Sequence, residues 1–200
     1  MEKTRDTRAP TATQTAAAAP PLRILCLHGQ RQTGQLFRDR ISRLAAQLVK
    51  LQLAELNFVD GPIELPTDDG SASLRGWYGD EAELTAPLEA LQSHWASGQY
   101  DGVLGFSAGG LAAAVIATLP THFPSCRFAI CASAPAQPAP SAWASAASKA
   151  RIPSLHLFSA DDLAVPAAVR RALLGASTCK CSPRRLLFPT GLPRAHSHLV

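Results

Sequence analysis

Short apolar runs alternate along the chain with longer segments in which apolar residues recur every three or four positions. A short apolar run bounded by glycine or proline is typical of a buried strand, and the longer spacing is typical of an amphipathic helix. The strands predicted in this way cover residues 22–29, 54–62, 100–106, 127–134, 154–160 and 184–189. Because helical or irregular segments separate them, we expect an α/β fold with a mostly parallel sheet of about six strands and helices on both faces.

Helical spacing is clearest at residues 35–53, where six large apolar residues recur at that interval: Leu36, Phe37, Ile41, Leu44, Leu48 and Leu51. Asp80, followed three residues later by Glu83, is a plausible N-cap for a second helix. The segments predicted to be helical after the first are 80–97, 108–119 and 165–176. Two segments lack a regular pattern, so we expect a polar loop at 62–79 and an irregular or weakly helical excursion at 135–150.

Composition favours a single globular domain. The chain has 200 residues, of which 46% are hydrophobic and 17% charged, so one core at residues 21–200 is the default. Residues 1–20 offer no long apolar side chain beyond Met1 and are expected to form a flexible tail. Since no stretch of about 18 apolar residues occurs, we expect no stable membrane insertion.

Charge and cysteine content narrow the function classes. Acidic residues gather at 51–101 and basic ones at 149–200, which we interpret as solvated faces and not as a nucleic-acid surface. The five cysteines include no C-x-x-C pair, and Cys179 and Cys181 form a lone C-x-C. We therefore expect no metal site and no cofactor, and a reducing, cytoplasmic location. The oligomeric state stays open.

A serine follows the predicted strand at 100–106. Ser107 lies in the sequence GFSAGG, before an Ala/Gly-rich helix. This strand-turn-helix setting is typical of a nucleophile elbow, in which the flanking glycines Gly105 and Gly109 relieve crowding around a strained serine. The alternative is a small loop serine between glycines. A serine hydroxyl becomes a good nucleophile only when an imidazole removes its proton and a carboxylate orients that imidazole.

Candidate partners follow two later strands. We predict that Asp162, in the sequence SADDLAVP, is the acid and that Asp161 is a spare, although either aspartate could simply cap the next helix. The base is expected in RAHSHLV near the C-terminus, where His198 is favoured and His196 is the alternative. The order serine, aspartate, histidine along the chain is that of the α/β-hydrolases.

The stretch LHGQRQTG follows the first predicted strand and supplies a candidate oxyanion hole. Acyl transfer produces an oxyanion, which backbone N–H groups fixed in advance stabilise strongly. The N–H groups of Gln30 and Ala108 form the natural pair, and His28 would orient the loop without acting as the base. The alternative is a chance His-Gly pair after a strand.

Other residues of catalytic type have two interpretations. Trp77 and Tyr78 are candidates to line an acyl pocket, or they pack a surface loop. The remaining histidines are interpreted as structural or surface residues: His94, His122 and His156.

Five stretches together resemble the family of serine hydrolases, the fungal serine hydrolase and ovarian cancer-associated esterase group of the α/β-hydrolase superfamily. They are ILCLHGQRQTGQLFRDRI, FVDGP, GWY, DGVLGFSAGG and SADDLAVP, and they lie between about residues 22 and 166. The resemblance implies a small α/β-hydrolase without a large cap and a triad of Ser107, Asp162 and a C-terminal histidine. The family usually has glutamine where this chain has Ala108, a change that leaves the backbone donor in place.

The resemblance implies hydrolysis of a small-molecule carboxylic ester or thioester through an acyl-enzyme. An acyl-protein thioesterase or carboxylesterase is the alternative within this class, because GFSAGG resembles that group as well, whereas HGQRQTG and FVDGP argue against it. A catalytically weak protein that binds an acyl ligand is the alternative outside it. That interpretation rests on RAHSHLV, which lacks the glycines around the family's catalytic histidine and ends at Val200.

Overall fold

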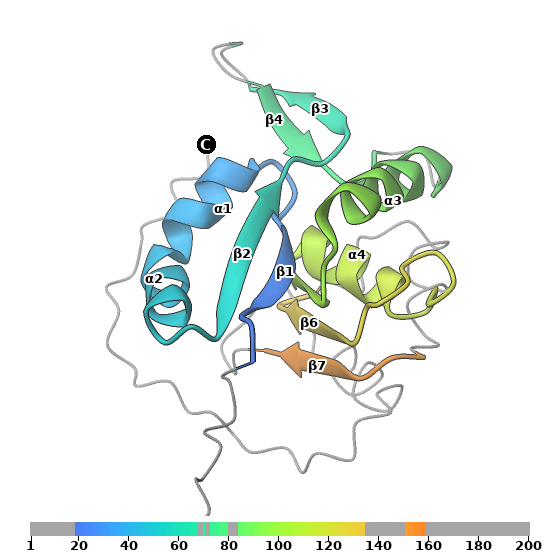
Figure 1. The fold of residues 1–200 in the computed structure, drawn as a ribbon. Coiled ribbons are helices and arrows are strands. Elements are labelled where there is room, and N and C mark those ends of the chain that lie inside the picture. The colour runs from blue at the N-terminus through green and yellow to red at the C-terminus, as the bar shows by residue number, and fades with distance from the viewer. Residues whose placement is uncertain (1–18, 68–69, 71–72, 80–83, 135–150, 159–200) are drawn as a thin grey trace, which may run out of the picture.

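Five parallel strands form the central sheet of the computed structural model, which describes residues 19–67, 70, 73–79, 84–134 and 151–158. The strand order is β2-β1-β5-β6-β7, and every neighbouring pair is parallel (Figure 1). The strands are β1 (Leu22–Leu27), β2 (Ala54–Val59), β5 (Gly102–Phe106), β6 (Phe128–Ala132) and β7 (Ser154–Leu157). The predicted parallel sheet is confirmed for these five strands, and the predicted strand at 184–189 lies outside the described residues.

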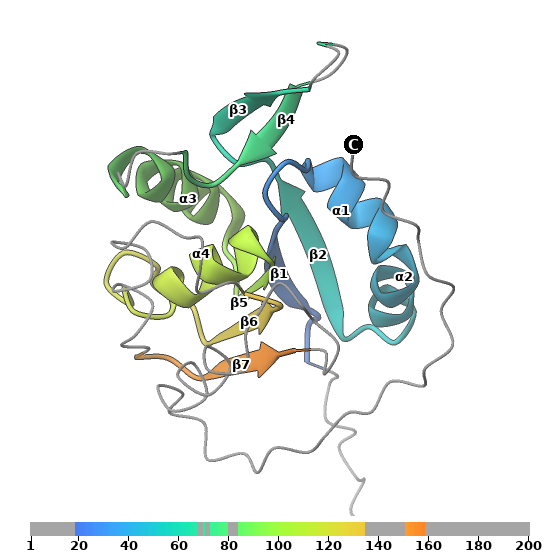
Figure 2. The same ribbon diagram turned by 180° about the vertical axis from the view of Figure 1, so that it is seen from behind.

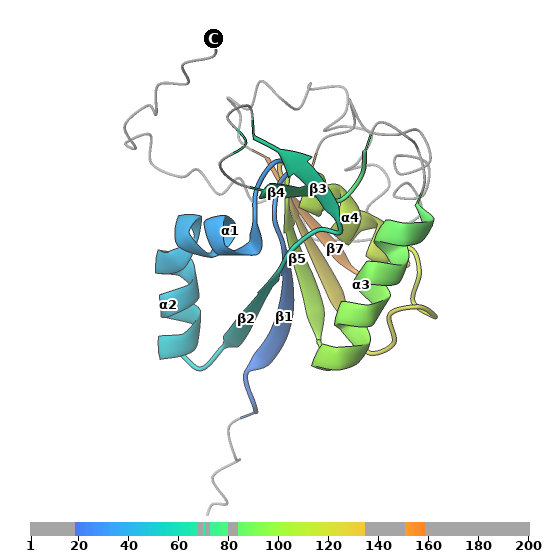
Figure 3. The same cartoon turned by 90° about the horizontal axis from the view of Figure 1, so that it is seen from above.

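Helices cover both faces of the sheet, as predicted (Figure 3). One face carries α1 (Gly34–Arg40) and α2 (Ser42–Lys50), and the other carries α3 (Thr85–Gly98) and α4 (Ala108–Ile116). Because successive side chains of a strand point to opposite faces, β1 contributes Leu25 and Leu27 to the core beside α4 and Ile24 and Cys26 to the cluster beside α1.

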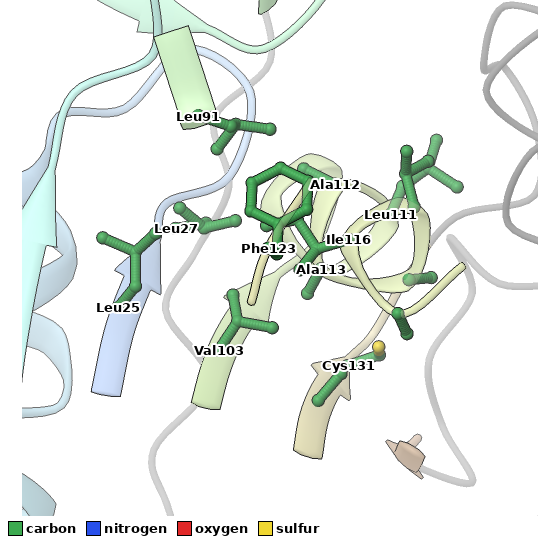
Figure 4. Packing of buried hydrophobic residues seen from close by; sticks show 14 of the residues in the cluster. Leu25, Leu27, Leu91, Val103, Leu111, Ala112, Ala113, Ile116, Phe123 and Cys131 are labelled. Carbon is green, nitrogen blue, oxygen red and sulfur yellow. The ribbon is translucent and has the colours of Figure 1, made fainter. Parts of the chain in front are cut away.

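The larger core lies between the sheet and α4. All nine residues of α4 are buried, and side chains of β1, β5 and β6 point toward this helix from the sheet (Figure 4). Burial raises the pKa of the Cys131 thiol to about 12, so this cysteine stays protonated and packs as a small apolar residue. Cys26 is buried and free as well, so both cysteines belong to the apolar interior.

The segment predicted as one helix at 35–53 is two helices that meet at Ile41. Hydrogen bonds continue across the junction, from Ile41 N–H to Phe37 O (3.2 Å) and from Ala45 N–H to Ile41 O (2.9 Å), so the junction is a bend. The apolar stripe of the two helices is narrower than the sequence suggested. Because a helix turns about 100° per residue, only part of the six predicted apolar residues can face the sheet. Phe37, Ile41 and Leu48 pack there, whereas three leucines are 42–63% exposed: Leu36, Leu44 and Leu51.

The prediction of a loop at 62–79 was wrong in part, because this segment contains an antiparallel hairpin. Its strands are β3 (Ile63–Pro66) and β4 (Ser73–Gly76), and it stands beyond the carboxyl edge of the sheet (Figures 1 and 2). Glu64 pairs with Arg75 directly across the strands, with Oε1 and Nη2 3.0 Å apart. The strands are only four residues long and contain few β-branched residues, so the usual sequence signal was weak.

Helix α3 begins at Thr85, and the predicted Asp80 cap lies outside the described residues. Pro87 is the third residue of this helix, where a backbone N–H has no acceptor within the helix, so it causes no kink. Within the described residues, no helix combines the length and the apolar composition needed to cross a bilayer.

Candidate active site

Ser107 lies on the tight turn between β5 and α4. Its backbone angles are φ 52° and ψ −119°, a region that costs a residue other than glycine about 1–3 kcal/mol. The turn is held at both ends, because Ser107 N–H donates to Ala132 O (2.9 Å) and Ser107 O accepts from Leu111 N–H (3.1 Å). This is the strained strand-turn-helix setting that the sequence predicted for Ser107.

The two glycines around Ser107 are required by close backbone packing. A Cβ atom on Gly105 would collide with the carbonyl oxygen of Gly109. A Cβ atom on Gly109 would collide with the carbonyl groups of Leu27 and His28 at the end of β1. Glycine is the residue that permits such an approach. The elbow is therefore packed directly against the loop that follows β1.

That loop is held by hydrogen bonds at two successive peptide groups. The His28 carbonyl accepts from Trp77 Nε1 (2.7 Å), and the N–H of the same peptide, on Gly29, donates to Gln32 Oε1 (3.2 Å). The Gly29 carbonyl lies 2.7 Å from His28 Nδ1. The remaining polar group of the two peptides is the Gln30 N–H, which has no hydrogen-bond partner among the described residues. We refer to residues 28–32, which carry the predicted oxyanion donor Gln30, as the oxyanion loop.

His28 is completely buried and holds the oxyanion loop in place. Its Nε2 accepts a hydrogen bond from Gly61 N–H (2.9 Å), so in the neutral ring the proton is on Nδ1, which donates to the Gly29 carbonyl. Burial is the main cause that lowers the pKa of His28, which keeps the ring neutral. Both ring nitrogens are occupied by contacts that hold the loop, as expected, and the assignment of the base to another histidine stays a prediction.

The second predicted oxyanion donor is on a segment that packs against the segment of the first. Ala108 is the first residue of α4, where a backbone N–H has no acceptor within the helix. A Cβ atom on Gly29 would lie 3.2 Å from Cδ1 of Phe106, so the residue before Gln30 packs on the residue before Ser107. The packing thus brings the Gln30 and Ala108 segments together at the carboxyl edge of the sheet.

Two short motifs that lie far from this loop in the sequence contact it in the fold. In FVDGP, Gly61 N–H donates to His28 and Asp60 Oδ1 accepts from Gly34 N–H (2.6 Å). In GWY, Trp77 is 0% exposed and its indole binds the His28 carbonyl. The wholly buried side chain of Trp77 does not pack on a surface, and its place in the lining of an acyl pocket stays a prediction.

The sequence model of the serine hydrolase (FSH1) family matches residues 18–197 of this chain. The chain belongs to this family. "Esterase OVCA2" of Danio rerio is 29% identical over 228 residues, which cover 90% of this chain and 94% of that protein. "Esterase OVCA2" of Bos taurus is 30% identical over 193 residues, 75% of this chain and 80% of that protein.

Solved structures support the fold of this serine hydrolase. The crystal structure of Arabidopsis thaliana SOBER1 F65L is similar with a TM-score of 0.50 over 77% of this chain and 84% of that one. The sequences are 20% identical, so this likeness bears on the fold alone.

The predicted acid and base of this hydrolase lie outside the described residues. This applies to Asp162, to the spare Asp161, and to both candidate histidines, His198 and His196. The structure therefore packs the turn that carries Ser107 and Ala108 against the loop that carries Gln30, and the roles of these residues, like the rest of the triad, stay a prediction. Among the described residues there is no group of three or more histidine, cysteine or acidic side chains that could hold a metal ion.

The remaining histidines do not approach this site through any contact of the described residues. His122 is exposed and lies 3.2 Å from Thr121 Oγ1 through its Nδ1. His156 belongs to β7, where its Nε2 is 3.2 Å from Ser154 Oγ and its ring stacks on Phe158. Burial lowers the pKa of His156. The interpretation of His122 as a surface residue and of His156 as a structural residue is confirmed.

Proposed function

We propose that this serine hydrolase cleaves carboxylic esters or thioesters through an acyl-enzyme formed on Ser107, with Asp162 and His198 completing the triad. The observation that carries the proposal is the pairing of a strained serine turn with a loop that leaves one N–H, that of Gln30, unpaired among the described residues. Such a donor, fixed before the reaction begins, is what stabilises a developing oxyanion.

The direction of the Gln30 N–H follows from the planarity of the peptide group. In a trans peptide, the carbonyl of Gly29 and the N–H of Gln30 lie in one plane and point in opposite directions. His28 binds the Gly29 carbonyl from the buried side, so the Gln30 N–H is directed away from His28. The neutral imidazole thereby sets the orientation of the donor that would contact the substrate oxygen.

In the proposed reaction, His198 removes the proton of Ser107 Oγ as that oxygen attacks the acyl carbonyl carbon. The carbonyl oxygen becomes an oxyanion that accepts hydrogen bonds from the N–H groups of Gln30 and Ala108. When the tetrahedral intermediate collapses, the bond to the alcohol or thiol breaks and His198 returns the proton to that leaving group. Water then attacks the acyl-enzyme with His198 as the base, and Asp162 orients the imidazole throughout.

The names of the relatives support an ester as the substrate, because the zebrafish and cattle proteins are both called esterases. The oxyanion loop and the FVDGP segment hold each other through His28 and Gly61. These are the two stretches that distinguish the chain from acyl-protein thioesterases, which favours the esterase proposal. A cytoplasmic location remains part of the proposal, in line with the free thiols of Cys26, Cys126 and Cys131.

Steady-state hydrolysis of p-nitrophenyl esters of increasing chain length, together with matched acyl thioesters, tests this function. We expect Ser107→Ala to lower kcat by about 10⁴-fold or more, the size of effect seen when a triad nucleophile is removed. Asp162→Asn and His198→Ala should each lower kcat by at least about 10³-fold.

Asp161→Asn and His196→Ala are the matched controls and should remain active. An active Ser107→Ala variant would contradict the proposal. A large loss of activity in His196→Ala, with His198→Ala active, would reassign the base to His196. A large loss in Asp161→Asn, with Asp162→Asn active, would reassign the acid to Asp161. A wild-type protein that binds an acyl ligand without turnover would support the weak, ligand-binding interpretation instead.

A further inference from the structure

The exit of the hairpin is joined to the oxyanion loop by side chains from both sides. From the hairpin side, Trp77 Nε1 donates to the His28 carbonyl (2.7 Å). From the loop side, Gln30 Nε2 donates to Tyr78 O (2.7 Å) and Gln30 Oε1 accepts from Trp77 N–H (3.3 Å). One of these hydrogen bonds holds the His28 carbonyl, which precedes the Gln30 N–H along the chain. The other two hold the side chain of Gln30 itself.

The backbone extends this junction. Gln32 and Arg75 form an antiparallel bridge, with Arg75 N–H to Gln32 O at 2.9 Å and Gln32 N–H to Arg75 O at 3.3 Å. Gly76 packs on the carboxamide of Gln30, because a Cβ atom there would lie 2.8 Å from both Nε2 and Oε1 of Gln30. The end of β4 therefore fits closely against the oxyanion loop.

We propose that the Trp77 indole and the Gln30 carboxamide are positioning residues, which clamp the oxyanion loop to the hairpin and so fix the Gln30 N–H where the oxyanion forms. This inference rests on the proposed function. The hairpin then influences kcat by holding the oxyanion loop in position. The side chain of Gln30 likewise influences kcat by fixing the backbone N–H of the same residue.

Such a clamp affects the transition state more than the bound substrate. The oxyanion exists only after Ser107 has attacked, so a displaced N–H weakens an interaction that the ground state makes poorly. Misplacing a catalytic group by about 1 Å can cost about 10²-fold in rate. Loss of the clamp should therefore lower kcat and leave KM nearly unchanged.

The chain provides a matched control for Trp77. Trp95 is also buried, at 4% exposure, and its Nε1 donates to Pro124 O (2.8 Å) between α3 and the segment after α4. Trp77→Phe and Trp95→Phe each remove one indole-to-carbonyl hydrogen bond, which is buried at Trp77 and part-buried at Trp95, and keep a ring in the core. They should cost similar stability, whereas only Trp77→Phe removes a bond to the oxyanion loop.

The experiment compares the full-length wild-type protein with both variants in ester hydrolysis and in binding of an alkyl trifluoromethyl ketone, which forms a tetrahedral oxyanion adduct with an active serine. We expect Trp77→Phe to lower kcat about 10- to 100-fold, with KM changed less than about threefold, and to weaken ketone binding by the factor lost in kcat. Trp95→Phe should match the wild type in all three.

A second pair keeps the test decisive if Trp77→Phe does not fold. Gln30→Leu removes both side-chain hydrogen bonds of Gln30 and keeps its backbone N–H. Gln35→Leu is the control, because it removes only an exposed hydrogen bond within α1, from Gln35 Nε2 to Asp39 Oδ1 (2.9 Å). Gln30→Leu should reproduce the loss in kcat and in ketone affinity, and Gln35→Leu should not.

Each other outcome counts against the inference. Equal activities of Trp77→Phe and Trp95→Phe, or a rise in KM without a fall in kcat, would overturn the positioning role while the proposed function stands. Inactivity of the wild type toward esters, thioesters and the ketone would instead show that the proposed function itself has failed, and the clamp with it.

Discussion

The elbow and the oxyanion loop lie against each other, but different forces hold them. The elbow depends on close packing, because Gly105 and Gly109 each occupy a place where a single added carbon would strike backbone atoms. The oxyanion loop depends on side-chain hydrogen bonds, from His28 and Gln32 within the loop and from Trp77 after the hairpin. One added carbon is enough to disrupt close backbone packing, whereas hydrogen bonds can be removed one at a time. Substitutions should therefore lower stability and activity sharply in the elbow and by smaller steps in the oxyanion loop.

The largest effect is expected at the elbow. Gly109→Ala places a methyl group on the carbonyls of Leu27 and His28, which requires a backbone shift and should cost about 3 kcal/mol of unfolding free energy. Activity should be lost with it. Urea unfolding and ester hydrolysis of the same preparation measure both.

Gly110→Ala is the control within the same helical turn. Its Cβ atom would lie 3.1 Å from Ala132 O, a tight contact that small shifts can relieve, and alanine favours the helix by about 1 kcal/mol over glycine. Its net effect should be small. Equal stabilities for the Gly109 and Gly110 variants would contradict the steric account of the elbow.

A smaller, graded effect is expected beside the oxyanion loop. Asp60 Oδ1 accepts from Gly34 N–H at the start of α1 (2.6 Å), so Asp60→Ala should cost about 1 kcal/mol, as for a lost helix cap. Asp60→Asn retains an acceptor oxygen and should lie near the wild type. Thermal unfolding would decide the point, and an asparagine variant as unstable as the alanine variant would argue for a charge effect in place of the hydrogen bond.

The smallest effect is a dependence of stability on pH. Burial lowers the pKa of His28 and of His156 from the ordinary value of 6.5, so below pH 6.5 the unfolded chain binds protons that the folded chain does not. The contribution of these two histidines to the unfolding free energy is therefore fully present above pH 6.5, and it decreases as the pH falls toward their folded pKa values.

Replacing one of the two histidines tests this linkage. His156 Nδ1 is buried and unpaired among the described residues, so His156→Leu should fold, and its urea midpoint should fall less steeply between pH 7.5 and 5.5 than that of the wild type. An unchanged slope would show that His156 does not take part in the linkage.

The sequence predicted the elbow better than the loop, for a physical reason. A close backbone approach requires glycine, so Gly105 and Gly109 appear in the sequence at a fixed distance from Ser107. The Trp77 bond gives no such local signal, because it depends on a partner 49 residues away and on a hairpin whose strands are too short to be recognised. Helical spacing likewise predicted an amphipathic helix at 35–53 but not its bend at Ile41.

The most direct test of the central claim is to locate the reactive residue. The full-length protein is treated with a fluorophosphonate, digested and analysed by peptide mass spectrometry. We expect one phosphonyl adduct per chain, on Ser107, formed in the wild type and absent from Ser107→Ala. An adduct on another residue, or no adduct on native protein, would contradict the assignment of Ser107 as the nucleophile.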